Sequence, residues 1–410
     1  MSYLEVCAWE KGECVLNYDN LRILIIAHDV PYPPTHGGRV DMWNRIKALD
    51  ALGSTIYLIA WADENVTNDN LTVIQEHVEH VVVLKRIKAP YLGLHPLYPH
   101  TVATRRPERV TFEQLLRETR DFSPHLVMLD GIHGWILARR LCEQLSVPLV
   151  YRSHNVEYSY IKKIFLVEPK VLRKMVLALD VPKMYFLERS IRRKSAVVFD
   201  ISDEDRQKWA VLNRHFERAK VLHPVILAQD ENITDKCLLN TSVDVLYVGN
   251  LFSPNNIDGL KWFLTKVRPL LNGLRIKIAG SNPSTAIREL LLRSGVEYEF
   301  DVEDVSHLYE QAKVLINPVW KTEGVNMKMI EMLATGKPVV TTVAGVKGLP
   351  SAVASYVTVA NEPESFANAI KEAHGRGVNL KQKDETIRIF GMSSIVEALD
   401  IMRMFVKLVR

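Results

Sequence analysis

Residues 314–342 read VLINPVWKTEGVNMKMIEMLATGKPVVTT. The runs at 314–318 and 338–342 are apolar along their whole length, which is typical of strands buried on both faces of a parallel sheet. Between them, Asn326 is a favourable N-cap residue for a helix, and Gly336 is suited to end that helix before the second run. The stretch therefore predicts a strand–helix–strand unit, the repeating element of an α/β fold.

Similar apolar runs occur along the rest of the chain, separated by helical patterns. The predicted strands are 22–27, 55–61, 80–84, 125–130, 148–152 and 196–202 in the first part, and 243–249, 275–280, 296–300, 314–318 and 338–342 in the second. The polar segment 223–242 separates the two sets. We therefore predict two doubly wound domains joined by a linker. Ligands bind beyond the carboxyl ends of the strands in such sheets, so a cleft between the domains is the expected site.

The composition is that of an ordinary globular protein and excludes several classes. The 410 residues are 47% hydrophobic and 24% charged, and a formal net charge of +4 gives no general case for nucleic acid as a partner. The cysteines, which show neither metal-ligand spacing nor a dense disulfide pattern, are Cys7, Cys14, Cys142 and Cys237. No apolar run approaches the roughly 18 residues of a membrane-spanning helix, and the first residues do not resemble a signal peptide. The sequence predicts a cytoplasmic protein.

The loop after the first strand contains three prolines and then Gly37 and Gly38. The glycines allow a tight turn into a helix, and the free amides at a helix start attract anions. A purely structural turn is an equal alternative. No GxGxxG motif occurs in this loop, which counts against a dinucleotide oxidoreductase.

A second loop of interest follows the strand at 148–152 and contains His154 and Asn155. A single histidine is more often structural than functional. Its position at a strand end, where ligands bind, makes His154 a candidate site residue.

The third loop belongs to the opening stretch. Lys328 and Glu331 are three residues apart on the predicted helix, so they share one face, and Glu323 and Gly324 precede that helix. Amides at the helix start together with the Lys328 ammonium suit a diphosphate. The Glu331 carboxylate can accept hydrogen bonds from vicinal hydroxyls such as those of a ribose, and Glu323 from those of a sugar. The alternative is an exposed ion pair between Lys328 and Glu331.

Five segments in order resemble retaining glycosyltransferases of the GT-B fold, in particular glycosyltransferase family 4 (group 1). They are PYPPTHGGR at 31–39, YRSHNVEY at 151–158, FDISDEDRQKW at 199–209, VLYVGNLFSPNNIDGLKWF at 245–263, and the E-x7-E pair Glu323 and Glu331 with the following MLATGKPVVTT. The resemblance extends from about residue 22 to residue 350. It implies an α/β GT-B fold, in which two Rossmann-like, doubly wound domains face each other across a cleft.

The resemblance also implies roles for individual residues. Lys328 would bind the donor diphosphate, Glu331 the ribose of the nucleotide, and Glu323 with the amides near Gly324 and Val325 the transferred sugar. Gly38 and Gly249 would lie at the donor, with Gly38 facing the phosphates and the acceptor. His154 would lie beside the sugar and the reacting oxygens. The implied donor is UDP- or GDP-linked, and neither a cofactor nor a metal is expected.

The sequence departs from the family pattern at two places. Asn250 and the segment 253–256 stand where many members have an arginine and a lysine, so one phosphate contact is missing, or comes from Arg39 or from Lys328 alone. HPVIL at 223–227 replaces the usual segment at the domain junction. These departures leave open a non-catalytic partner subunit with this fold, and a sugar-nucleotide epimerase or a phosphorylase is a further alternative.

Asp203 and Asp205 have the DxD spacing of the metal sites in many sugar-nucleotide enzymes. However, Ser202 followed by Asp205 is typical of a helix start, where acidic residues favour the helix dipole. We therefore interpret these residues as a capping motif and expect chemistry without a metal.

The resemblance suggests a domain division. An N-terminal domain on the acceptor side would cover 1–232, with 1–20 as an extension of unknown role, and a nucleotide-sugar-binding domain would cover 243–390. A C-terminal helix at 391–410 would pack back on the N-terminal domain. The predicted enzyme transfers a sugar to an acceptor hydroxyl of a glycan, a lipid-linked acceptor or a protein, in glycan, polysaccharide or glycolipid synthesis.

Residues 161–194 interleave basic and large apolar side chains, which is typical of segments that lie on an anionic membrane surface. The alternative is a pair of ordinary helices with apolar faces on the core and charges in water. Pro169 and Pro182 are expected to break the run, so no single long helix is predicted. The hypothesis that follows is peripheral contact with the inner face of the membrane through 161–194, and a lipid-linked acceptor.

Overall fold

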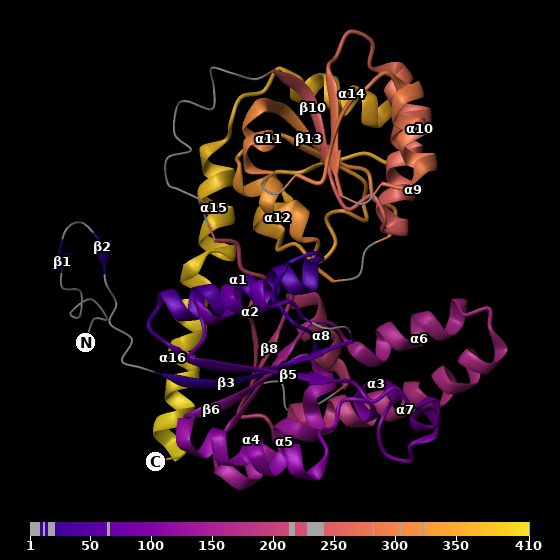
Figure 1. The fold of residues 1–410 in the computed structure, drawn as a ribbon. Helices are drawn as coiled ribbons and strands as arrows, with labels where there is room; N and C mark the ends of the chain where they lie inside the picture. Colours follow the sequence, from indigo (N-terminus) through magenta and orange to yellow (C-terminus); the bar gives the residue numbers. More distant parts are fainter. Residues whose placement is uncertain are drawn as a thin grey trace. The chain divides into compact units, whose positions relative to one another are not determined.

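The computed structural model describes residues 9–10, 13–14, 21–63, 66–212, 218–227, 242–281, 283–302, 305–321 and 324–409. Contacts divide the chain into two compact units (Figure 1). Unit 1 consists of Met1–Val225 and Ser394–Arg410, and unit 2 consists of Ile226–Ser393. Each unit contains one parallel sheet, and the short strands β1 (Trp9–Glu10) and β2 (Glu13–Cys14) form a separate antiparallel pair.

The sheet of unit 1 has seven parallel strands in the order β5-β4-β3-β6-β7-β8-β9. The strands are β3 (Arg22–Ala27), β4 (Thr55–Ala62), β5 (His80–Lys85), β6 (Leu126–Asp130), β7 (Leu149–Ser153), β8 (Val197–Asp200) and β9 (Ala219–Val221). The central strands are buried along nearly their whole length because helices cover both faces of the sheet.

The helices of unit 1 follow the strands in the alternation that the sequence predicts. They are α1 (Gly37–Ala51), α2 (Asn68–Gln75), η1 (Pro90–Leu94), α3 (His100–Ala103), α4 (Arg109–Phe122), η2 (Ile132–Gly134), α5 (Trp135–Leu145), α6 (Glu157–Val167), α7 (Val171–Lys194) and α8 (Asp203–Leu212), joined by the later part of α16 (Met392–Val409). Figure 1 shows α1 on one face of this sheet and α4 and α5 on the other.

The sheet of unit 2 has six parallel strands in the order β12-β11-β10-β13-β14-β15. The strands are β10 (Val243–Val248), β11 (Ile276–Gly280), β12 (Glu297–Phe300), β13 (Ala312–Asn317), β14 (Val339–Thr341) and β15 (Thr358–Val359). The helical segments are α9 (Pro254–Trp262), η5 (Phe263–Val267), η6 (Arg268–Leu270), α10 (Thr285–Ser294), α11 (Ser306–Gln311), α12 (Met327–Ala334), α13 (Ser351–Ala354), α14 (Pro363–His374) and α15 (Leu380–Phe390).

The opening stretch folds as a β13–α12–β14 unit, which confirms the prediction. Asn326 is the N-cap residue of α12, and its side-chain oxygen accepts a hydrogen bond from the amide of Lys328 at 3.2 Å. Gly336 follows the helix with φ +72°, a backbone conformation that a residue with a side chain rarely adopts. The N-terminal turn of α12 is thus fixed beside the carboxyl end of β13.

Each sheet has a point where the chain reverses its direction of winding. In unit 1 the chain runs through β3, β4 and β5 to one edge and then returns to β6, on the other side of β3. In unit 2 it runs from β10 to β12 and returns to β13 on the other side of β10. In doubly wound sheets the loops after such a pair of strands usually diverge, and ligands bind between them.

The helical hairpin of unit 1 differs from the expectation in one respect. The chain breaks at Pro169 between α6 and α7, as expected, but α7 continues through Pro182 to Lys194. The prediction of a second break at Pro182 was wrong. Proline cannot donate one hydrogen bond, and the packing of Leu177, Met184 and Leu187 in the core holds the helix on both sides of it.

Candidate active site

The unit 2 site is built around Lys328, which extends from the first turn of α12 towards the end of β10. Its ammonium donates a hydrogen bond to the side-chain oxygen of Asn256 at 3.0 Å and lies 5.1 Å from the ring centre of Tyr247. Asn256 belongs to the first turn of α9. The lysine is therefore held at the point where unit 2 reverses its winding.

Two glycines make this arrangement possible. A Cβ atom at Gly249 would lie 2.8 Å from the Tyr247 hydroxyl and 3.0 Å from the Lys328 ammonium. A Cβ atom at Gly259 would lie only 1.7 Å from the carbonyl oxygen of Pro318, so glycine lets α9 approach the loop after β13. Glycine at these two positions therefore lets α9 and the Lys328 side chain of α12 lie close together at the end of β10.

Glu331 lies one turn further along α12, where the Tyr309 hydroxyl donates a hydrogen bond to its carboxylate at 3.4 Å. Burial raises the pKa of Glu331 from 4.5 to about 7, although Tyr309 and Lys328 act in the opposite direction. Burial also lowers the pKa of Lys328 from 10.5 to about 8, although Glu331 acts against this. Lys328 thus contacts Asn256, and Glu331 contacts Tyr309. Within the described residues the two side chains form no ion pair with each other. This excludes the alternative of an exposed ion pair between Lys328 and Glu331.

The loop before α12 is described only in part, because Glu323 lies outside the described residues. Gly324 has φ +65°, and Val325 is buried. The neighbouring loop contacts both residues, since a Cβ atom at Gly348 would lie 3.1 Å from the Val325 side chain and 3.2 Å from the Gly324 carbonyl oxygen. Packing between the two loops therefore fixes the backbone just before Lys328.

The residues that replace the expected arginine and lysine have a structural role. The side-chain oxygen of Asn250 accepts a hydrogen bond from the amide of Phe252 at 2.8 Å, and its carbonyl oxygen accepts one from the Asn256 amide group at 2.9 Å. This chain of contacts ends on Lys328. Among the described residues, Lys328 is the cation that these contacts hold at the end of β10.

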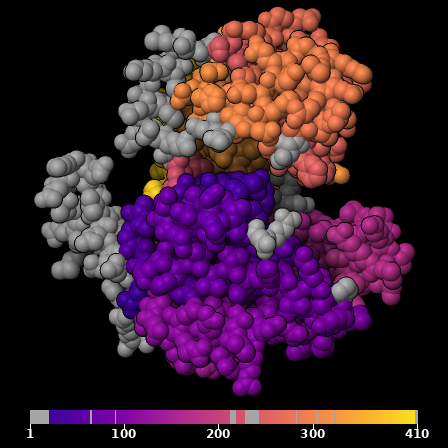
Figure 2. Space-filling model, viewed as in Figure 1, coloured from indigo at the N-terminus to yellow at the C-terminus, as the bar shows by residue number. Residues whose placement is uncertain are grey.

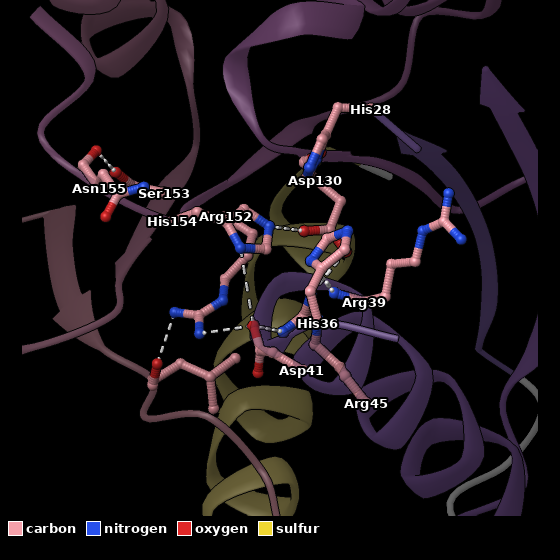
Figure 3. Close-up of polar contacts among 11 residues, drawn as sticks. His28, His36, Arg39, Asp41, Arg45, Asp130, Arg152, Ser153, His154 and Asn155 are labelled. Atoms are coloured by element: carbon pink, nitrogen blue, oxygen red, sulfur yellow. Dashed lines mark hydrogen bonds and ion pairs between the residues drawn. The ribbon is translucent and has the colours of Figure 1, made fainter. Parts of the chain in front are cut away.

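The unit 1 site is centred on Asp130, the last residue of β6, which is 1% exposed. One carboxylate oxygen contacts His154 Nε2, and the other accepts a hydrogen bond from Arg45 at 2.5 Å (Figure 3). Burial alone would raise the pKa of Asp130, but Arg45 and His154 hold it well below its ordinary value. The carboxylate is thus charged and fixes the orientation of the His154 ring.

A second buried carboxylate, Asp41 of α1, completes the cluster. It accepts hydrogen bonds from Arg45 at 2.8 Å and from Arg152 at 3.2 Å, and it lies 3.8 Å from His154 Nδ1 (Figure 3). Burial would raise the pKa of Asp41, whereas Arg45, Arg152 and His154 hold it below its ordinary value. Both nitrogens of the His154 ring therefore face carboxylates whose charges the two guanidinium groups balance.

Two further histidines surround His154 at the carboxyl ends of β3 and β6. The ring centre of His28 is 5.2 Å from that of His154 and 5.5 Å from that of His133. Burial and the neighbouring His154 lower the pKa of His28 from 6.5 to about 4, and burial and Arg105 lower the pKa of His133 well below 6.5. A Cβ atom at Gly131 would lie 2.8 Å from His28 Nδ1, so only glycine permits this approach.

The sequence analysis identified His154 but missed Asp41, Arg45, Asp130 and His28. A usable signal existed, because His28 and Asp130 stand at the ends of two predicted strands. Whether two strand ends meet depends on the order of the strands in the sheet. That order is a property of the folded chain and not of any single segment.

Gly38 lies in the first turn of α1, whose N-cap residue is His36. The space beside it is open, since a Cβ atom there would meet only the His36 ring at 3.5 Å. Arg39, one of the alternatives for a phosphate contact, donates two hydrogen bonds to Asp29 at 2.8 and 2.9 Å. Its charge is therefore already balanced within unit 1.

The capping interpretation of the DxD motif is confirmed. The Ser202 hydroxyl accepts a hydrogen bond from the amide of Asp205 at 3.2 Å at the start of α8. Asp203 pairs with Arg206 at 3.3 Å and Asp205 with Lys208 at 3.2 Å. Among the described residues, no group of three or more His, Cys, Asp or Glu side chains could hold a metal ion. Independence from metals remains a prediction.

This chain is similar in sequence to a known protein family and to a known protein. Residues 242–375 match the family model Glycosyl transferases group 1. A Klebsiella pneumoniae protein named "Uncharacterized 44.6 kDa protein in cps region" is 25% identical over 368 residues, which are 85% of this chain and 90% of that protein.

Solved structures show the same fold. Anabaena Alr3699/HepE in complex with UDP is 15% identical with a TM-score of 0.61, over 92% of this chain and 99% of that chain. A glycosyltransferase from Rickettsia africae is 12% identical with a TM-score of 0.62, over 95% and 100% of the two chains. Sucrose-phosphate synthase from Thermosynechococcus elongatus is 15% identical with a TM-score of 0.62, over 95% and 99%.

The two doubly wound parallel sheets of this chain, together with these similarities, define its fold as the GT-B fold. Residues 242–375, which are similar to the Glycosyl transferases group 1 family, contain the Lys328 site.

Proposed function

We propose that this protein is a retaining glycosyltransferase, which moves a sugar from a nucleoside diphosphate to an acceptor hydroxyl. The observation that carries the proposal is the position of Lys328 at the start of α12 and beside Gly249, with Glu331 one turn deeper. An ammonium and the free amides of a helix start form a site for a diphosphate. The crevice of a doubly wound sheet is where such a ligand binds.

The remaining donor contacts follow from the chemistry of the neighbouring groups. Glu331 would accept hydrogen bonds from the two ribose hydroxyls, and Glu323 with the backbone of Gly324 and Val325 would hold the sugar. HepE has been crystallised with UDP and with UDP-glucose, which supports a uridine donor over a guanosine donor. We propose that the reaction needs neither a cofactor nor a metal, because Lys328 and the helix start can balance the charge of the departing diphosphate.

We assign His154 the position beside the transferred sugar that the resemblance implies. Asp130 and Asp41 fix the imidazole ring from two sides, so its orientation would not change during the reaction. The departing phosphate would help to remove the proton of the acceptor hydroxyl, and the sugar would keep its anomeric configuration. The protein would mainly stabilise charge and position the reactants.

We propose a cytoplasmic enzyme of glycan, polysaccharide or glycolipid synthesis, whose acceptor is lipid-linked. Residues 157–194 support a lipid-linked acceptor, because this part of unit 1 exposes basic and apolar side chains together. Within the described residues, no helix is long and apolar enough to cross a membrane. A glycan or a protein is the alternative acceptor.

The test is turnover by the purified chain. UDP-sugars and GDP-sugars are supplied in turn with lipid-linked and water-soluble acceptors, and release of the nucleoside diphosphate is followed. Nuclear magnetic resonance of the product then shows whether the anomeric configuration is retained. Conversion of the donor without an acceptor would indicate an epimerase, and phosphate-dependent cleavage would indicate a phosphorylase.

A non-catalytic partner subunit is the second candidate. Asn250 and the segment 253–256 favour it, because they replace the cations expected there. Lys328 and Glu331, both held by hydrogen bonds in the crevice, argue against it. Binding of UDP without turnover under every acceptor condition would support this candidate.

A further inference from the structure

The helical hairpin formed by α6 and α7 exposes a second apolar face that the core of unit 1 does not use. On α7, the side chains of Leu177, Met184, Leu187 and Ile191 pack into the core. Beyond Val171 at its first position, the exposed large apolar side chains of the same helix are Leu172, Met175, Leu179 and Phe186. Their spacing of three, four and seven residues places them along one side of a helix. A helix needs only one apolar face to pack on a core. Packing within unit 1 therefore does not explain the exposed apolar face of α7.

The exposed apolar surface is largest at the tip of the hairpin, where α6 ends and α7 begins. Val167 is 80% exposed, Val171 72% and Leu172 81%, and Leu166 is exposed beside them. Single exposed apolar residues are common on protein surfaces, but a group of adjacent ones indicates an interaction site. Figures 1 and 2 show this hairpin projecting from the rest of unit 1.

A neighbouring segment adds to the same surface. A Cβ atom at Gly93 of η1 would lie 3.1 Å from the side chain of Val176, and the Gly93 carbonyl oxygen accepts a hydrogen bond from Lys183 at 3.4 Å. The segment is thus fixed against α7. It exposes three more large apolar side chains, which are Tyr91, Leu94 and Leu97. We call these residues, together with the exposed apolar residues of the hairpin, the docking surface.

The exposed charge around this surface is positive. The acidic residues of the hairpin, all buried, are Glu157, Glu168, Asp180 and Glu188. The exposed basic residues are Lys162, Lys163, Lys170, Arg173, Arg189, Arg193 and Lys194. Near the end of α7, Phe186, Arg189, Ser190 and Arg193 line a hollow of about 420 Å³, where an apolar ring and two guanidinium groups lie together.

We propose that the docking surface binds an anionic membrane surface. The apolar side chains at the hairpin tip would enter the boundary between headgroups and acyl chains, and the surrounding lysine and arginine side chains would contact the anionic headgroups. A second copy of the chain is a poorer occupant, because it would bring like charges together. The proposal concerns unit 1 alone and does not depend on the donor site.

Sedimentation of the full chain with vesicles tests the proposal. Binding is compared between phosphatidylcholine vesicles and vesicles that also contain phosphatidylglycerol, at low and at high salt. We expect binding to the anionic vesicles only, and weaker binding at high salt because salt screens the headgroup charge. Replacing one basic residue, as in Lys170→Gln, should lower the partition coefficient about fivefold at low salt.

Matched variants separate the docking surface from the rest of the protein. The double variant Leu172→Ser, Met175→Ser should lower the partition coefficient at least about tenfold, because two exposed side chains lose their apolar contact with the lipid. Val211→Ser on α8 and Lys381→Gln on α15 change equally exposed residues elsewhere and should bind as the wild type does. Unchanged thermal unfolding confirms that each variant is folded.

Several results would overturn the proposal. They are the absence of binding to anionic vesicles, equal binding to neutral ones, and undiminished binding by the double variant. Dimer formation in sedimentation velocity that the double variant abolishes would show that a second copy occupies the surface instead. Because the assay contains neither donor nor acceptor, its failure would leave the proposed transferase activity untouched.

Discussion

The burial of Lys328 lowers its pKa and so affects whether its side chain is charged. Lys328 is charged only while its amine is protonated, and burial lowers its pKa from 10.5 to about 8. Removing the side chain deletes a charge-assisted contact with the diphosphate, worth roughly 1.5–3 kcal/mol. We expect Lys328→Ala to lower turnover about 10- to 100-fold and to leave the fold intact. Steady-state kinetics over a range of donor concentrations checks this, with Lys381→Ala as the control, and a wild-type rate would refute the diphosphate assignment.

The same pKa values predict how donor binding depends on pH. As the pH rises through about 8, Lys328 in the free protein loses its proton, so the affinity for the donor should fall. As the pH falls through about 7, Glu331 gains a proton and loses its ability to accept two hydrogen bonds from the ribose, so the affinity should fall again. Binding should therefore be strongest between these two values. In Lys328→Arg the charge persists, and the decline at high pH should disappear in calorimetric titrations.

Glu331 and Glu323 should differ in which part of the donor they recognise. The ribose is common to the sugar nucleotide and to the bare nucleoside diphosphate, so Glu331→Ala should weaken both ligands alike. Glu323→Ala should weaken the sugar nucleotide more than the bare nucleotide. Titration of both ligands into both variants distinguishes the roles, and equal losses throughout would contradict them.

At the scale of elements, a variant at the start of α8 distinguishes a structural role of Asp203 from a role in catalysis. Ser202 and the acidic first turn stabilise the beginning of this helix, so Asp203→Asn should cost a few tenths to about 1 kcal/mol of unfolding free energy. Turnover should not change, and an excess of chelator should leave it unchanged as well. Activity that chelator abolishes and manganese or magnesium restores would show that the reaction needs a metal after all.

The elements also show how far the sequence could predict the fold. Every predicted strand is present, and most of them are apolar runs, which leave little choice of structure. Four strands of two or three residues were missed, because they contain too few residues for a pattern; they are β1, β2, β9 and β15. On α1 the sequence shows an apolar stripe, whereas Asp41 and Arg45 are buried beside it. Their partners, Asp130 and Arg152, belong to strands far away in the sequence, and no local sequence pattern predicts such a pairing.

At the scale of the whole molecule, the proposed donor residues Lys328 and Glu331 belong to unit 2, whereas Gly38 and the buried cluster around His154 belong to unit 1. The sequence could predict that Lys328 and Glu331 lie close together, because one helix with Asn326 as its N-cap carries both. It predicted less of the cluster around His154, since that cluster forms only when β3, β6 and β7 lie side by side. Nucleotide binding should therefore stabilise unit 2 more than the strands of unit 1.

Hydrogen exchange measured with and without UDP tests this separation. A ligand at 100 times its dissociation constant adds about 2.7 kcal/mol of stability to the state that binds it. We expect slower exchange in α12, in the loop after β10 and in the first turn of α9, because these segments hold Lys328 and Asn256. Exchange in β3, β6 and β7 should stay the same, and Lys328→Ala should remove much of the protection. Protection confined to unit 1 would show that the nucleotide binds elsewhere, and a parallel measurement with GDP shows which base the site prefers.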